Sequence, residues 1–180
     1  MDLPSISGPA VILAGSCAQR TRDQLFCFAR SAPVLQLDLM ADPVALTAQA
    51  LDFVSGQDGT PCAIATSAPP ETVEKLHARF GREGTSARAD AVFAALAPAL
   101  VASGIRRILV AGGETSGTVI RALNITRLQV GPYGGPGIGS AVTLGRDPLA
   151  LCLKSGKLGP VDMLAGALDA MAQGAHVRAK

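Results

Sequence analysis

The sequence predicts a three-layer α/β sandwich in which helices cover both faces of a mainly parallel sheet of about six strands. Short apolar runs alternate with segments of helical periodicity along the chain. The runs are apolar throughout, as expected for strands that are buried on both faces. Hydrophobic residues make up 48% of the 180 residues, enough for one sizeable core. We therefore expect a single Rossmann-like domain over 1–180, with frayed ends at 1–9 and 175–180.

Three strands and three helices are expected in the first half of the chain. The strands are the apolar runs at 10–14, 34–39 and 62–66. Helical patterns follow over 21–29, from Asp42-Pro43 to about Val54, and from Pro70 onward. Asp42 and Pro43 form a good N-cap and first-turn pair. The polar stretch 81–86 predicts a break, after which an Ala-rich helix continues to about Ser103 with Gly104 as its C-cap.

The second half of the chain continues the alternation of strands and helices. The expected strands are 107–111, 127–130 and 149–153. The expected helices run from the glycines after the first of these strands to about Leu123, and from Val161 to Met171. Between the fifth and sixth strands, residues 131–139 are rich in glycine and proline and predict a loop that is too short to link two domains.

Composition argues against a nucleic-acid partner and against a membrane span. The net charge is +2, aromatic residues make up 3% of the chain and there is no Trp, whereas nucleic-acid-binding domains are typically basic and stack bases on aromatic rings. The longest low-charge run, 91–105, is too short to span a bilayer. Its apolar residues recur at helical spacing and predict a core helix; they are Val92, Phe93, Leu96, Leu100 and Val101.

The cysteine pattern predicts free thiols. Cys17, Cys27, Cys62 and Cys152 form no CxxC pair, and no His lies at metal-ligand spacing from them. We therefore expect no cluster of metal-ligating residues, and a reducing compartment. The N-terminus also lacks a basic region followed by an apolar core, the pattern of a secretory signal. Together these features predict a cytoplasmic protein.

The segment Gly112-Gly-Glu-Thr-Ser-Gly117 is the most informative stretch, because it joins an apolar strand to the start of a helix. Free N–H groups and the positive end of the helix dipole favour an anion there, usually a phosphate. Gly112 and Gly113 accept positive φ values, and the hydroxyls of Thr115 and Ser116 could cap the helix and bond a phosphate or ribose. Glu114 has two interpretations: contact with Mg²⁺ or a sugar hydroxyl, or a favourable charge on the helix dipole.

Two further loops follow strand ends. The first contains Ser16, whose hydroxyl could face a ligand or simply cap the next helix. The second contains Lys154, Ser155 and Gly156. A lysine just past a strand end in such a loop is well placed to balance phosphate charge, although a solvated surface lysine is the plainer interpretation.

Several common catalytic patterns are missing. The chain has no GxxxxGK[ST] phosphate loop and no GxGxxG dinucleotide fingerprint. No Ser–His–Asp arrangement is indicated either. His77 is expected on the polar face of a helix and His176 in the C-terminal tail, so neither is expected to be catalytic. The catalytic residues therefore stay unknown at this stage.

Taken together, the three loops resemble one family. Gly15-Ser-Cys with the later Thr21 and Gln24, Gly112-Gly-Glu-Thr-Ser-Gly117, and Leu153-Lys-Ser-Gly-Lys-Leu-Gly159 occur in order along nearly the whole chain. They resemble the C-terminal, nucleotide-binding domain of the four-carbon acid sugar kinases. The resemblance implies ATP with Mg²⁺ and phosphorylation of acids such as threonate or erythronate. The nucleotide-binding residues that we expect are Ser16, Gly112, Gly113, Glu114, Thr115, Ser116, Gly117, Lys154, Ser155 and Gly156.

The chain also departs from the family pattern. The usual PGVP segment is Pro136-Gly-Ile-Gly139, and Lys157-Leu158 replaces the usual Asn-Phe or Gln-Phe after LKSG. The family's N-terminal domain, which binds the sugar acid, is absent from this sequence. The resemblance therefore implies a chain that binds ATP or ADP, phosphorylates poorly by itself, and works with a missing or separate N-terminal half. An uncovered apolar face could also lead to a homo-oligomer.

Two other functions stay open from the sequence. One is a non-catalytic module that binds a nucleotide or a sugar phosphate and regulates a partner. The other is an oxidoreductase with a degenerate dinucleotide site, in which Asp38 or Asp42 would meet a ribose.

Overall fold

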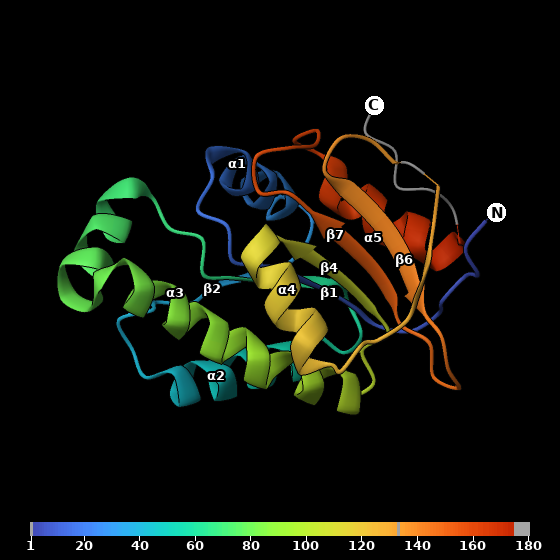
Figure 1. The fold of residues 1–180 in the computed structure, drawn as a ribbon, viewed down its shortest axis with the longest axis horizontal. Helices are drawn as coiled ribbons and strands as arrows, with labels where there is room; N and C mark the ends of the chain where they lie inside the picture. Colours follow the sequence, from blue (N-terminus) through green and yellow to red (C-terminus); the bar gives the residue numbers. More distant parts are fainter. Residues whose placement is uncertain (1, 133, 175–180) are drawn as a thin grey trace.

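A seven-stranded sheet forms the middle layer of the computed structural model, which describes residues 2–132 and 134–174 (Figure 1). The strands are β1 (Ala10–Ala14), β2 (Val34–Gln36), β3 (Cys62–Ala65), β4 (Arg107–Ala111), β5 (Leu128–Val130), β6 (Ile138–Thr143) and β7 (Ala150–Lys154). Their order across the sheet is β2-β3-β1-β4-β7-β6-β5. β6 pairs antiparallel with both neighbours, and every other pair is parallel.

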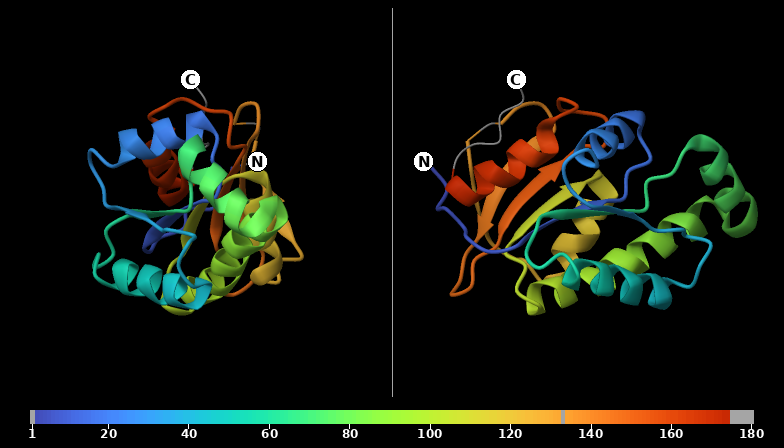
Figure 2. Two further views of the ribbon diagram at one scale, coloured as in Figure 1. Left: turned by 90° about the vertical axis from the view of Figure 1, so that its left-hand side faces the viewer. Right: turned by 180° about the vertical axis from the view of Figure 1, so that it is seen from behind.

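Helices cover both faces of the sheet. They are α1 (Gln19–Phe28), α2 (Pro43–Ser55), α3 (Pro70–Ala102), α4 (Gly113–Ala122) and α5 (Met163–Gln173). α1 and α5 pack on one face, and α2, α3 and α4 pack on the other (Figure 2). The central strand β1 serves both cores, because Ile12 faces the first pair of helices while Val11 and Leu13 face the second group. The predicted α/β sandwich is confirmed.

The strand that the sequence did not predict is β6. It begins inside the glycine- and proline-rich segment that we expected to be a loop, and four of its six residues are buried. Glycine at position 139 interrupts the apolar pattern that would have marked a strand. Pairing with β7 and β5 on both sides supplies the stability that local sequence preference does not.

The expected break at 81–86 is reduced to a kink at one residue. Gly81 has φ +72° and ψ 170°, and helix continues on both sides of it. α3 is the one helix of the described residues that is long and apolar enough to cross a bilayer. Its C-terminal half instead lies in the core, where Val92, Phe93, Leu96 and Leu100 are fully buried. Gly104 follows the helix with φ +104°, as expected for a residue just past a helix end.

The N-terminal segment is packed rather than frayed. Leu3 and Ile6 are buried, and the N–H of Ile6 donates to the carbonyl of Met171 at the end of α5. The apolar side chains of this segment join the core beneath α5, which explains the difference from the expectation. The expected tail at 175–180, with His176, lies outside the described residues. All four cysteines are free, as predicted, and Cys17 is exposed.

Candidate functional site

The site lies where the chain direction across the sheet reverses. After β1 the chain moves to β2 and β3 on one side, whereas after β4 it moves to β5, β6 and β7 on the other. The connections after the adjacent strands β1 and β4 therefore diverge and leave a crevice at their carboxyl ends, which is the usual binding position in open α/β sheets. The loops after β3 and β7 border the same crevice, because these strands flank β1 and β4.

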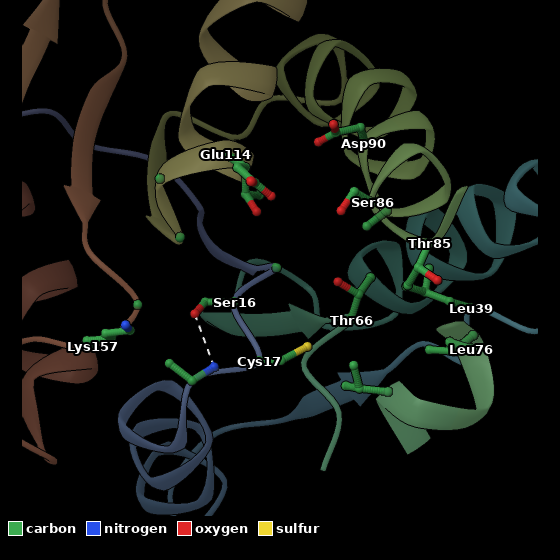
Figure 3. Close-up of a pocket in the computed structure, with 18 of the residues that line it drawn as sticks. Ser16, Cys17, Leu39, Thr66, Leu76, Thr85, Ser86, Asp90, Glu114 and Lys157 are labelled. Atoms are coloured by element: carbon green, nitrogen blue, oxygen red, sulfur yellow. Dashed lines mark hydrogen bonds between the residues drawn. The ribbon is translucent and has the colours of Figure 1, made fainter. Parts of the chain in front are cut away.

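A cavity of about 700 Å³ occupies this crevice. Its walls include 15–18 after β1, Thr66 after β3, 112–115 after β4 and 155–157 after β7. The remaining wall comes from Leu39 and from α3 (Figure 3). The three loops that we singled out in the sequence thus line one cavity.

Glycines allow these loops to touch. A Cβ at Gly156 would lie 1.9 Å from Ser16 Oγ, and one at Gly15 would lie 2.0 Å from Thr115 Oγ1. Both distances are far shorter than a van der Waals contact, so no side chain fits at either position. Gly112 has φ +129°, a conformation that favours glycine. The motif glycines are therefore required to bring the loops after β1, β4 and β7 together.

The Ser16 loop is held by backbone and side-chain bonds. Ser16 Oγ accepts a hydrogen bond from the N–H of Ala18 at 3.2 Å (Figure 3). Ser67 Oγ donates to the Ser16 carbonyl at 2.6 Å. Ala18, not Ser16, is the N-cap of α1. The alternative in which Ser16 is the N-cap residue is thus wrong, because α1 begins two residues later than that role requires.

The start of α4 presents free donors. Gly112 is its N-cap, and no side chain caps the helix. The expected capping by Thr115 and Ser116 is wrong: Ser116 Oγ donates to the Gly112 carbonyl at 2.7 Å instead. The first N–H groups of a helix have no acceptor within it. They are available at the cavity wall formed by Gly113, Glu114 and Thr115. Ser116 and Gly117 do not line the cavity.

Lys154 is neither a solvated surface lysine nor a lining residue of the cavity. It is 2% exposed, and its Nζ lies 3.4 Å from Thr21 Oγ1. Thr21 Oγ1 in turn donates to the Gly156 carbonyl at 2.8 Å. Burial lowers the pKa of Lys154 to about 8. Lys154 is therefore buried beneath the loop after β7 and does not project from it. The exposed lysine at the cavity is Lys157.

Sequence reasoning missed the α3 side of the cavity. His77, Ser86 and Asp90 line it, together with Thr66 from the end of β3. Thr66 is the last residue of a predicted strand, and its place at the carboxyl end of that strand is a signal that could have found it. The α3 residues carried no such signal, because their approach to the cavity depends on how the helix crosses the sheet.

Some acidic residues cap helices or turns, and others line the cavity. Asp42 caps α2 by accepting from Val44 N and Ala45 N, and Asp38 accepts from Met40 N. Neither lines the cavity, whereas Glu114 and Asp90 do. No group of three or more His, Cys, Asp or Glu side chains in 2–132 and 134–174 is placed to hold a metal ion. A Mg²⁺ ion at Glu114 would therefore need ligand phosphates or water to complete its coordination.

Comparison with known proteins identifies the family. Residues 11–164 match the family model described as the nucleotide-binding C-terminal domain. The chain belongs to this family. It is 43% identical over 173 residues to a 3-oxo-tetronate kinase from Methylobacterium radiotolerans, covering 93% of this chain and 40% of that protein. It is 39% identical over 176 residues to a 3-oxo-tetronate kinase from Pseudomonas fluorescens, covering 96% of this chain and 41% of that protein.

A solved structure supports the same assignment. A Haemophilus influenzae protein of the DUF1537 family superposes on this nucleotide-binding C-terminal domain with a TM-score of 0.82 and 27% identity, covering 96% of this chain and 42% of that one. The resemblance to the four-carbon acid sugar kinases is confirmed. The chain spans about two fifths of the length of the curated relatives that it matches.

Proposed function

We propose that this chain is the ATP-binding domain of a kinase that phosphorylates four-carbon sugar acids. The observation that carries the proposal is the junction of three loops at the carboxyl ends of β1, β4 and β7, closed by glycines that leave no room for a side chain. Backbone N–H groups at the start of α4 add the donors that a phosphate needs. Membership of a nucleotide-binding family and relatives named 3-oxo-tetronate kinase support the same ligand.

The residues present fit a nucleotide with Mg²⁺. The glycines let the backbones of the three loops meet at one cavity, and Lys157 adds a positive charge at its edge. Glu114 would help to hold Mg²⁺, which neutralises phosphate charge when bound. Phosphoryl transfer depends mainly on positioning and charge neutralisation, so these residues would hold and orient the phosphates.

The acceptor is proposed to be a four-carbon sugar acid. Relatives of this chain carry the name 3-oxo-tetronate kinase, and most of their length lies outside the matched region. We therefore propose that a second domain or partner recognises the sugar acid and supplies the general base that deprotonates the sugar-acid hydroxyl. The isolated chain is expected to bind ADP but to phosphorylate a sugar acid slowly or not at all. The cytoplasm is the proposed compartment, in keeping with four free cysteines.

Calorimetry with the isolated chain tests the proposal. ADP with Mg²⁺ should bind at one site, and NADH should not bind. A coupled kinase assay with a four-carbon sugar acid should give little turnover. Failure to bind ADP or ATP would overturn nucleotide binding, and rapid turnover by the isolated chain would overturn the need for a second domain. A non-catalytic module is the conclusion if ADP binds but no turnover appears after the matching N-terminal domain of a relative is added.

A further inference from the structure

The cavity has two chemically different ends. One end carries the glycine junction, the start of α4 and Lys157, all of which favour anions. The opposite end is walled by Leu39, Leu76, Thr66 and Ser86 (Figure 3). Each end also has one carboxylate, Glu114 at the first and Asp90 at the second, but only the first has Lys157 and the free N–H groups of α4 to balance phosphate charge. The uncharged part of a nucleotide therefore has one direction in which to extend from the anion end.

The Thr66 hydroxyl is an unpaired polar group at this second end. Thr66 is 2% exposed, and its Oγ1 has no hydrogen-bond partner in the described residues. The oxygen points toward the cavity (Figure 3). A buried hydroxyl without a partner lowers stability by about 1–3 kcal/mol. Valine would fill the same volume, so packing does not explain the hydroxyl, and its oxygen is available to a molecule that enters the cavity.

We propose that Thr66 and the facing residues of α3 form the nucleobase subsite of the cavity. This inference rests on the proposed nucleotide-binding function. The base lies against Leu39 and Leu76, and the Thr66 hydroxyl bonds a heteroatom on its edge. Ser86, from the part of α3 that follows the Gly81 kink, closes the outer side. The kink thus changes the direction of α3 between Leu76 and Ser86, both of which line the subsite.

Two variants of the 180-residue chain separate the base from the phosphates. Thr66→Val removes the hydroxyl at constant volume, and Ser86→Trp fills the outer side from an exposed position on α3. Each is titrated by calorimetry with ADP and with pyrophosphate. Thr66→Val should weaken ADP binding about fivefold, as expected for one lost hydrogen bond, and Ser86→Trp should weaken it more. Neither should change pyrophosphate binding.

Thermal unfolding distinguishes a ligand contact from a structural one. The unliganded Thr66→Val variant should melt at the same temperature as the unaltered chain or higher, because an unpaired hydroxyl has been removed. The matched control is Thr47→Val on α2, whose hydroxyl donates to the Pro43 carbonyl and lies outside the cavity. It should leave ADP binding unchanged.

The outcomes that overturn the inference differ from those that overturn the function. Equal weakening of ADP and pyrophosphate by Thr66→Val, or ADP binding no tighter than pyrophosphate binding in the unaltered chain, overturns the nucleobase subsite alone. A lower melting temperature for Thr66→Val with unchanged ADP binding does the same. Absence of any binding by the unaltered chain overturns the nucleotide site and the subsite together.

Discussion

Replacing Lys154 by Met tests whether a buried charge beneath the site supports phosphate binding. The side chain is 2% exposed, its ammonium contacts the Thr21 hydroxyl, and no carboxylate pairs with it within 2–132 and 134–174. Burial lowers its pKa to about 8, the Cys152 thiol acts in the opposite direction, and Arg20 lowers it further. An unpaired buried ammonium is costly, so its presence next to an anion site calls for a direct test.

The expected magnitude follows from the position of the charge. Nζ reaches the Gly156 carbonyl through the Thr21 hydroxyl, that is, through two hydrogen bonds. At an effective dielectric constant of about 20 and an assumed separation of about 8 Å, a unit charge would stabilise a phosphate charge by ~2 kcal/mol. That energy corresponds to about a thirtyfold change in Kd. Lys154→Met should therefore weaken ADP binding about ten- to thirtyfold at pH 7.

The pH dependence has opposite signs for binding and for stability. ADP affinity should fall as the pH rises through about 8, because Lys154 loses its charge there. The contribution of Lys154 to stability should rise over the same interval. The folded pKa lies below the ordinary value of 10.5, so the unfolded chain binds more protons between about pH 8 and 10.5. Lys154→Met should remove both contributions. Burial raises the pKa of Cys62 to about 11 and that of Cys152 to about 12, so these two thiols lower stability above about pH 9 in both chains, and the difference between the chains isolates the Lys154 slope.

Calorimetry and denaturant unfolding from pH 7 to pH 10 measure these two slopes. A Cys17→Ser background removes the one thiol that lines the cavity from the titration. Thr21→Ser is the matched control, because it keeps the hydroxyl that contacts both Nζ and the Gly156 carbonyl and removes only a methyl group. It should preserve both the ADP affinity and the pH slope. ADP binding by Lys154→Met that matches the unaltered chain at every pH would refute the electrostatic reasoning.

Three further variants test the site and the fold. Gly156→Ala should weaken ADP binding at least tenfold in calorimetry because its Cβ meets Ser16 Oγ, whereas Gly166→Ala on α5, whose Cβ meets nothing within 4 Å and which does not line the cavity, should bind normally. Equal affinities would contradict a tight junction. Glu114→Gln should reduce the increase in ADP affinity that Mg²⁺ causes. If the increase is unchanged, Glu114 does not hold Mg²⁺ and acts only as a favourable charge on the dipole of α4. Asp42→Ala should lower the free energy of unfolding by about 1 kcal/mol with ADP binding intact, since Asp42 caps α2.

Much of the fold could be predicted because its strands are buried on both faces. The runs at β1, β3 and β4 are continuously apolar, and this pattern needs no knowledge of the neighbouring strands. The loops after β1, β4 and β7 were recognised as site loops because Gly and Ser directly follow these strands. β6 carried no such pattern, since its strand character depends on pairing with β5 and β7.

The parts of the site that could not be predicted depend on three-dimensional direction. The sequence does not indicate whether a lysine at the end of β7 points outward or inward, and packing against α1 determines that Lys154 points inward to Thr21. His77, Ser86 and Asp90 reach the cavity only because α3 crosses the sheet beside it and bends at Gly81. Helical periodicity identifies a polar face, but it does not identify what that face meets.

Two features around the cavity lower the stability of the empty domain. Thr66 buries an unpaired hydroxyl, and Lys154 buries an ammonium without an acidic partner. Local rules of folding are most often violated where function requires it. A purely structural explanation would need two unrelated causes for two costs at one place. A bound nucleotide would give both a single cause, with phosphates near Lys154 and a base against Thr66. ADP binding should therefore slow amide hydrogen exchange most strongly in segments 112–115 and 154–156.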